Sequence, residues 1–165
     1  MSALSVAGPA FSVGTNLLVD ELSAGGAETI LAHLQTATAA IAAVEVRVLG
    51  GAIARVADGA TAFGHRRTKL MVNIAAMDKR VEKRAEYETW AAGLAEALSG
   101  GVTTPAYVGF IGEEGEDGVR RAYPPATLKR LAQVKRRYDP DNLFHLNLNV
   151  APATLPGQRR RREAQ

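Results

Sequence analysis

Hydrophobic residues recur at helical spacing in three stretches of the chain. The first, residues 20–43, has a candidate N-cap at Ser23, followed by a glycine pair that weakens its first turn. The second, residues 81–98, is charged at its start and apolar towards its end. The third opens at a Pro-Pro pair and stops at an Asp-Pro pair, covering residues 124–139. The spacing predicts three helices.

Other stretches alternate apolar and polar residues, which is typical of half-buried strands. They are residues 44–49, 52–56, 69–76 and 103–111. The segment 1–16 is rich in small residues and is expected to be loose, and the acidic, glycine-rich segment 112–118 is expected to be a loop. The order of these elements predicts an α+β fold, with an antiparallel or mixed sheet and helices packed on one face.

Composition narrows the class of protein. The 165 residues suffice for one domain, and 47% hydrophobic with 22% charged residues is ordinary for a soluble globular chain. No apolar run approaches the length of a membrane span, and no basic segment precedes an apolar one as in a secretory signal, so we expect a cytoplasmic protein without a membrane partner. The absence of cysteine excludes disulfides, thiolate metal sites and a cysteinyl-flavin bond in this chain.

The charge pattern carries little functional information. The net charge of +3 is concentrated in the four arginines at 159–162, and we expect residues 153–165 to be a disordered, solvated basic tail. No basic face interleaved with aromatic residues indicates nucleic-acid binding. The histidines His33, His65 and His145 lack metal-ligand spacing, so no metal site is expected.

The most specific stretch is residues 131–150. Its Tyr-Asp-Pro-Asp-Asn segment predicts a fixed turn, anchored by Phe144. Asn147 and Asn149 follow two apart in a run expected to be extended, which would point both carboxamides to one side. Two carboxamides together can satisfy a polar heterocycle, since each donates and accepts hydrogen bonds.

This stretch resembles the C-terminus of the berberine-bridge-enzyme-like family of FAD-linked oxidases, whose pattern is roughly Leu-x-x-Val-Lys-x-x-Tyr-Asp-Pro-x-Asn-x-Phe followed by Asn-x-Asn. Further similarities follow in the family's order along the chain. They are residues 49–52, residues 60–66, Trp90, residues 107–110 and residues 121–123. The resemblance covers residues 17–152, which we interpret as the family's C-terminal, substrate-side domain without the N-terminal FAD-binding domain.

The resemblance implies roles for three residues. Tyr107 corresponds to the family tyrosine that lies beside substrate and flavin and acts as a base in several members. Asn147 and Asn149 are implied flavin contacts. The family has an asparagine two residues after the tyrosine, where this chain has Gly109. No Gly-x-Gly-x-x-Gly phosphate loop occurs, so the isolated chain is not expected to hold FAD alone.

Each of these residues also has a structural interpretation. Tyr107 can be a packed strand aromatic, and the two asparagines can be turn and strand-edge polar groups. His65 and Arg66 can stabilise a turn through hydrogen bonds, or approach the flavin. Trp90 is expected in the core.

The resemblance implies the substrate-side domain of an FAD-dependent oxidoreductase, which oxidises a small organic substrate by hydride transfer to flavin. Such a domain would need a flavin domain on a partner chain, or would cover its exposed surface by forming a homo-oligomer. The alternatives are a binding or assembly module that has lost the reaction, and a gene fragment or excised domain.

Overall fold

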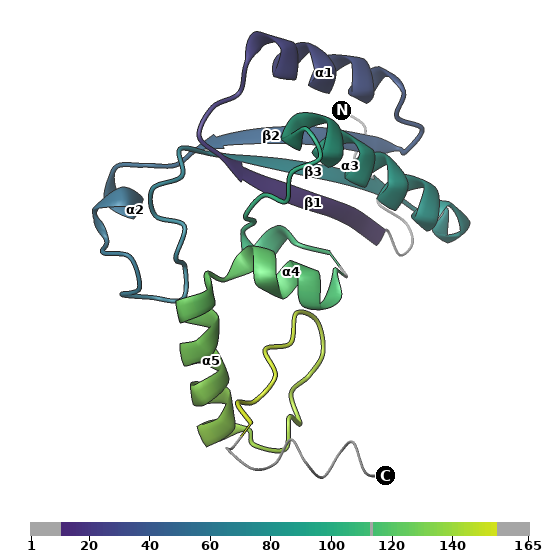
Figure 1. Ribbon diagram of the computed structural model, residues 1–165. Helices are drawn as coiled ribbons and strands as arrows, with labels where there is room; N and C mark the ends of the chain where they lie inside the picture. Colours follow the sequence, from purple (N-terminus) through teal and green to yellow (C-terminus); the bar gives the residue numbers. More distant parts are fainter. Residues whose placement is uncertain (1–10, 113, 155–165) are drawn as a thin grey trace, which may run out of the picture.

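The computed structural model describes residues 11–112 and 114–154. Three strands, β1 (Phe11–Val19), β2 (Ile41–Val48) and β3 (Leu70–Asp78), form an antiparallel sheet in the order β1-β3-β2 (Figure 1). β3 is therefore central, and β1 and β2 are both edge strands. The sheet and its helices confirm the α+β class.

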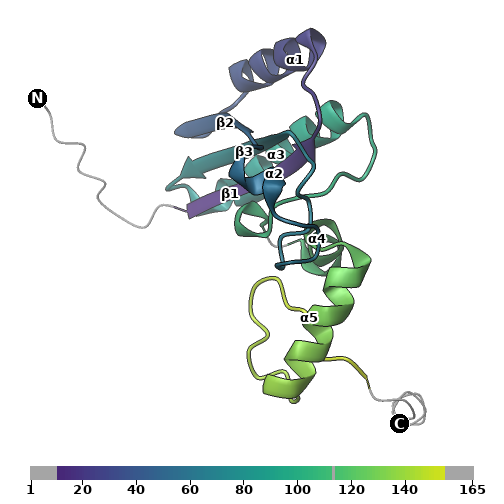
Figure 2. The ribbon, with the colours of Figure 1, turned by 90° about the vertical axis from the view of Figure 1, so that its left-hand side faces the viewer.

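Two helices pack on one face of this sheet (Figures 1 and 2). They are α1 (Ala24–Gln35) and α3 (Arg84–Ser99). Ser23 caps α1 as expected, since its Oγ accepts a hydrogen bond from the Gly26 N–H at 3.0 Å. Gly100 ends α3 with a φ of 62°, a left-handed cap that glycine adopts without steric cost.

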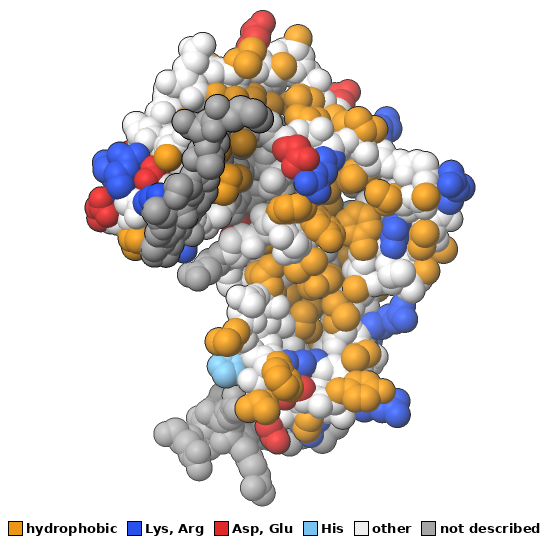
Figure 3. Space-filling view, turned by 180° about the vertical axis from the view of Figure 1, so that it is seen from behind, with side chains coloured by type: hydrophobic (Ala, Val, Ile, Leu, Met, Phe, Trp, Pro, Cys, Tyr) orange, Lys and Arg blue, Asp and Glu red, His pale blue; other side chains and the backbone are white. Residues whose placement is uncertain are grey.

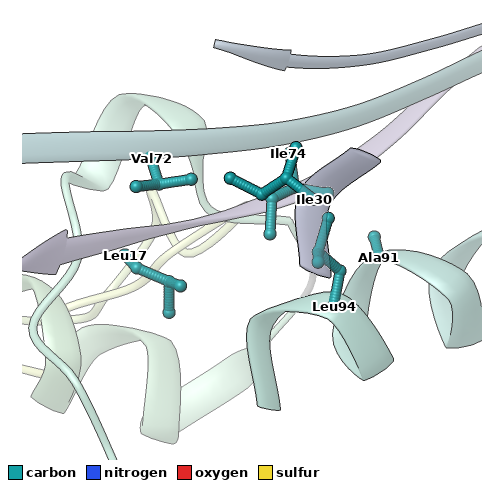
Figure 4. Packing of buried hydrophobic residues seen from close by; sticks show 6 residues of the cluster. All are labelled: Leu17, Ile30, Val72, Ile74, Ala91 and Leu94. Carbon is teal, nitrogen blue, oxygen red and sulfur yellow. The ribbon is translucent and has the colours of Figure 1, made fainter. Parts of the chain in front are cut away.

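The core lies between the sheet and these two helices (Figure 4). Leu17 of β1 is opposite Val72 of β3, so both side chains share the face that meets α1 and α3. The buried cluster consists of Leu17, Ile30, Val72, Ile74, Ala91 and Leu94. Trp90 packs against this cluster, as the sequence predicted.

The rest of the described chain forms a second layer below the sheet (Figure 1). Its elements are α2 (Ala52–Arg55), the 3-10 turn η2 (Val108–Phe110), α4 (Gly115–Ala122) and α5 (Pro125–Tyr138), whereas the 3-10 turn η1 (Val81–Lys83) leads directly into α3. α5 projects away from the sheet in both views, and the chain after it runs back along α5, where the Ala153 N–H donates to the Ala132 carbonyl at 3.0 Å. Within the described parts, no helix combines the length and apolarity needed to cross a bilayer.

One expectation about the N-terminal part is wrong. Residues 11–16 are not loose but belong to β1, which the small residues in the segment concealed. β3 approaches β1 so closely at Gly14 that a side chain has no room there, because an added Cβ would collide with the Ile74 carbonyl oxygen. The remainder of the predicted loose segment, residues 1–10, lies outside the described residues, as do residues 155–165 of the predicted tail.

Three element types also differ from the prediction. The helix predicted to reach residue 43 ends at Gln35, and β2 begins at Ile41. Residues 52–55 of the predicted strand 52–56 form the short helix α2 instead. The predicted acidic loop contains the first turn of α4, where Glu116 and Asp117 lie near the positive end of the helix dipole.

The stretch 103–111 is not a strand either. Its main chain bonds to two different elements in turn: Pro105 accepts from the Leu18 N–H at 2.9 Å, and the Ala106 N–H donates to the Arg121 carbonyl at 3.0 Å. It then closes into η2. Alternating residues gave a strand signal because the segment lies against the sheet edge without joining the sheet.

Candidate functional site

Tyr107 lies at the sheet face opposite the two large helices. Leu18 and Met71 face each other across β1 and β3 on that side, and both are buried. The Leu18 N–H donates a hydrogen bond to the Pro105 carbonyl, which fixes the segment that follows against β1. The segment 105–110 therefore covers one end of this sheet face and brings Tyr107 to it.

A buried carboxamide fixes the Tyr107 backbone. Asn16 of β1 is completely buried; its Nδ2 donates to the Tyr107 carbonyl at 3.0 Å, and its Oδ1 accepts from the Tyr107 N–H at 2.7 Å. This pair of bonds replaces the ladder that a strand neighbour would supply. Sequence reasoning missed Asn16 because it lay in the segment taken as loose; the alternation in residues 11–19 was the available signal.

The Tyr107 ring belongs to an aromatic cluster. It meets Phe63 edge-on at 5.9 Å between centroids and Phe110 at 5.7 Å, and Phe63 meets His65 at 6.2 Å. Tyr107 is nevertheless 38% exposed. Apolar side chains gather on this side of the molecule, between the sheet and α5 (Figure 3). Tyr107 is thus rigidly placed yet accessible to a ligand.

Two charged residues of β2 border the cluster. The Arg47 guanidinium lies 4.8 Å from the centroid of the Phe110 ring, in cation–π range. Arg47 donates to the Glu45 carboxylate at 2.7 Å. That hydrogen bond lowers the pKa of Glu45 and raises the pKa of Arg47, so both groups stay charged near neutral pH.

Gly109 shapes the cluster through its missing side chain. An added Cβ would lie 2.8 Å from Cε1 of the Tyr107 ring. The Tyr107 ring thus lies against η2 and occupies the space that a side chain at position 109 would fill. The glycine is coupled to the tyrosine orientation.

A second polar network ties α4 to β1. Glu114 forms an ion pair with Arg121 and accepts from the Thr15 hydroxyl at 2.7 Å. Arg121 also donates to the carbonyl of Asn16 at 2.6 Å and to the carbonyl of Thr104 at 2.9 Å. These bonds satisfy main-chain carbonyls that no strand reaches.

A groove of about 1650 Å³ runs along β1. β1 and α3 line it together with residues 108–112 and the start of α4. Asn147 lines the groove, whereas Asn149 does not. Tyr107 lies just before the lining segment, so Asn147 and the turn that follows Tyr107 border the same groove.

The C-terminal turn forms as predicted, but its anchor is different. Asp139 accepts from the main-chain N–H groups of Leu143 at 2.7 Å and Phe144 at 3.0 Å, and pairs with Lys135 at 2.5 Å. The Lys135 ammonium, helped by these N–H groups, lowers the pKa of Asp139. Phe144 is 78% exposed, so the carboxylate and not the aromatic ring holds the turn.

The two asparagines do not lie in an extended run. Asn147 sits in a bend with a left-handed φ of 60°, which breaks the two-residue periodicity that would align it with Asn149. The Asn149 Oδ1 is buried and has no hydrogen-bond partner among the described residues. It is an acceptor that a bound N–H group would satisfy.

His65 and Arg66 fit the structural interpretation. The His65 ring bonds to the Ala122 carbonyl at 3.1 Å, and Arg66 donates to the Phe63 carbonyl and the Thr61 hydroxyl at 3.0 and 2.6 Å. Both residues fix the connector that carries Phe63. In the described part of the chain, no group of three or more histidine or acidic side chains has the arrangement of a metal site.

Comparison with protein families gives one match: residues 106–151 match the family described as "Berberine and berberine like". This segment includes Tyr107, Asn147 and Asn149. Members of that family are FAD-linked. A comparison with curated protein sequences finds no match.

Several solved structures share the fold. Berberine bridge enzyme from Eschscholzia californica has a TM-score of 0.74 at 20% identity, over 88% of this chain and 34% of that one. The oxidoreductase GilR in complex with pregilvocarcin has 0.73 at 20% identity, over 86% and 33%. Physcomitrella patens BBE-like 1 has 0.72 at 21% identity, over 88% and 31%.

The chain thus spans about a third of the length of the solved structures that it matches. The family match and the shared fold confirm the resemblance inferred from the motifs. Residues 106–151 of this chain therefore match the berberine-and-berberine-like family model, and the chain shares its fold with solved structures that include berberine bridge enzyme.

Proposed function

We propose that this chain is the substrate-side domain of an FAD-dependent oxidoreductase. It acts on a small organic substrate together with a flavin domain on another chain. The observation that supports this best is Tyr107, which is held through its backbone by the buried Asn16 and remains 38% exposed in an aromatic cluster. A fixed, accessible phenol beside flat apolar rings suits an aromatic or otherwise planar substrate.

The residues fit a flavin in part. The buried, unpaired Oδ1 of Asn149 is an acceptor for a heterocycle N–H, and Asn147 offers a second carboxamide at the groove. The sequence contains no Gly-x-Gly-x-x-Gly loop for a pyrophosphate. Asn147 and Asn149 would then contact the ring system, and the partner chain would hold the rest of the cofactor.

A bound flavin would supply the acceptor for a hydride, which carries both electrons of the oxidation. The chain's own contribution is positioning and proton transfer. Phe63 and Phe110 lie against two sides of the Tyr107 ring, and Tyr107, in its phenolate form, accepts the substrate proton.

A second function has a specific observation in its favour. The family asparagine two residues after the tyrosine is replaced by Gly109, and the Tyr107 ring occupies the space above it. A domain that no longer needs this carboxamide can persist as a binding or assembly module without turnover.

The test combines the purified chain with an FAD-loaded flavin domain taken from berberine bridge enzyme. A panel of phenolic and alcohol substrates is added anaerobically, and bleaching of the flavin's visible absorption is followed. We expect bleaching that depends on the chain, and a loss of roughly 100- to 10,000-fold in its rate for Tyr107→Phe. Tyr138→Phe is the matched control, since Tyr138 is 73% exposed on α5.

The outcomes separate the two candidates. Complex formation without bleaching by any substrate supports the binding module. Bleaching that is unchanged in Tyr107→Phe removes the proposed base, and makes Tyr107 a packing residue.

A further inference from the structure

The two edges of the sheet are not equally protected. On β1, Leu18 bonds to Pro105 and the Asn16 carbonyl accepts from Arg121, so other segments cover part of the edge. Just after β2, the Leu49 N–H donates to the Lys69 carbonyl at 2.7 Å. Because hydrogen-bonded positions alternate along an antiparallel strand, the odd-numbered residues of β2 bond inwards to β3. The even-numbered positions of β2 therefore direct their N–H and C=O groups outwards.

These outward groups have no hydrogen-bond partner in residues 11–112 and 114–154. They belong to Ala42, Val44, Val46 and Val48. Val44 packs against the core, but the next two valine side chains are open to solvent: Val46 is 44% exposed and Val48 is 84% exposed. A straight, apolar strand edge of this kind is a template for another strand, and proteins rarely leave one open.

We infer that β2 pairs with β2 of a second copy of this chain, in an antiparallel arrangement centred on Val46. The two three-stranded sheets then become one continuous sheet, with the helices of both copies on the same face. Arg47 of this edge also contacts Phe110 of the Tyr107 cluster, but the inference rests on the strand edge and its charges and not on the proposed oxidoreductase function.

The centre of the pairing follows from the outward-facing positions. In a two-fold antiparallel pair centred on Val46, the Val46 residues of the two copies lie opposite each other. A residue two positions before Val46 in one copy lies opposite the residue two positions after it in the other, so Val44 faces Val48. All three valines then exchange main-chain hydrogen bonds with valines. Their side chains form one apolar row on the helix-bearing face of the joined sheet.

The charges on the opposite face single out the same centre. Centring on Val46 places Glu45 opposite Arg47 of the second copy, twice by symmetry. Centring on Val44 would instead leave Glu45 opposite Ala43. A centre at Glu45 or Arg47 would place like charges side by side, which is destabilising.

Within one copy, Glu45 and Arg47 already contact each other at 2.7 Å while their side chains are 49% and 44% exposed. Both are therefore available at the edge without a change of fold. In the paired arrangement, each would meet a partner of opposite charge on the neighbouring strand.

The test uses charge reversal and sedimentation of the purified chain across a range of protein concentrations. The unmodified chain is expected to dimerise. Glu45→Arg creates two Arg–Arg pairs and Arg47→Glu creates two Glu–Glu pairs, so each should weaken the dimer by roughly tenfold or more. Glu96→Arg makes the same charge change on the exposed side of α3 and should leave the dimer intact.

Two further samples make the test specific to the register. The double variant E45R/R47E restores opposite charges and should dimerise again. A mixture of the E45R and R47E chains should form a mixed dimer, because each reversed residue then faces its opposite. Rescue also shows that the single variants are folded.

Three results would overturn the inference. The first is a monomeric unmodified chain up to near-millimolar concentration. The second is a dimer that Glu45→Arg leaves unchanged, which would place the contact elsewhere. The third is the absence of rescue in both the double variant and the mixture.

Discussion

The layer formed by the sheet with α1 and α3 and the arm formed by α5 with residues 139–154 are held together by different forces. The layer encloses side chains such as Leu94 and Ile74, which are fully buried. In the arm, Thr127 is the buried residue of α5, and Leu143 and Leu146 are 73% and 80% exposed. Hydrophobic burial stabilises the layer, whereas the arm depends on a hydrogen-bonded turn.

The difference has a dynamic consequence. A region with little buried apolar area opens at a lower free energy than the global unfolding transition. We therefore expect the arm to open while the layer stays folded. Each of the first three predictions below compares two substitutions of the same residue type, one in the layer and one in the arm.

The largest effect is expected from leucine truncation. Leu94→Ala empties a fully buried site between α3 and the sheet and should lower the free energy of unfolding by about 2–5 kcal/mol. Leu143→Ala removes the same atoms from the exposed turn and should change it by less than about 0.5 kcal/mol. Denaturant unfolding of both variants measures this. Equal losses would show that the arm buries Leu143 in solution.

The second effect concerns a carboxamide. Asn16→Ala removes both bonds to the Tyr107 backbone. The Tyr107 N–H is left without a partner, while the Tyr107 carbonyl keeps the bond from the Phe110 N–H at 3.1 Å, so the loss should be about 2 kcal/mol. Asn147→Gly removes a carboxamide from an exposed bend whose left-handed φ glycine adopts without strain, and should cost far less. Unfolding experiments compare the two. A neutral Asn16→Ala would mean that water replaces the carboxamide, and Asn16 would lose its positioning role.

The third effect depends on pH. Asp78 is buried in the layer, where hydrogen bonds from Arg80 lower its pKa most and the Tyr87 hydroxyl adds to this at 2.8 Å. The folded protein therefore binds protons less readily here than the unfolded chain, whose Asp titrates near about 3.9. This stabilisation is complete above that pH and is lost as the pH falls further.

The pKa of Asp139 in the arm is lowered as well, so acid should loosen both regions, but with different readouts. Asp78→Asn should flatten the decline of global stability below about pH 4. Asp139→Asn should instead increase hydrogen exchange at the Leu143 and Phe144 amides and leave global unfolding nearly unchanged. Global loss from Asp139→Asn would contradict the independence of the arm.

The same contrast explains what the sequence could predict. Helix α5 and the cap at Ser23 follow from local signals, a proline pair and a side-chain oxygen, and both are present. The α+β class followed from the order of patterns. The layer's alternation at residues 69–76 also predicted β3, since strong burial enforces a strict period.

Failures occurred where long-range contacts decide the structure. The 103–111 segment alternates like a strand, but its hydrogen bonds go to Leu18 and Arg121 from distant parts of the chain. β1 was missed because Gly14 and Ser12 dilute the strand signal. Tyr107 was found through the family motif, yet Asn16, which fixes it, matched no motif. Its partner lies 91 residues away.

The smallest effect tests the junction between the two regions. Gly109→Asn places a side chain where the Tyr107 ring lies, 2.8 Å from its Cε1. The ring tip is the flexible end of the side chain, so we expect it to rotate away at a cost of about 1 kcal/mol or less. NOE contacts of the Tyr107 ring with Phe63 and Phe110 should weaken. Gly100→Asn, in open space at a left-handed φ that asparagine tolerates, is the control and should leave these contacts intact. Unchanged contacts in Gly109→Asn would show that backbone movement in η2 absorbs the new side chain, and that Gly109 does not set the orientation of Tyr107.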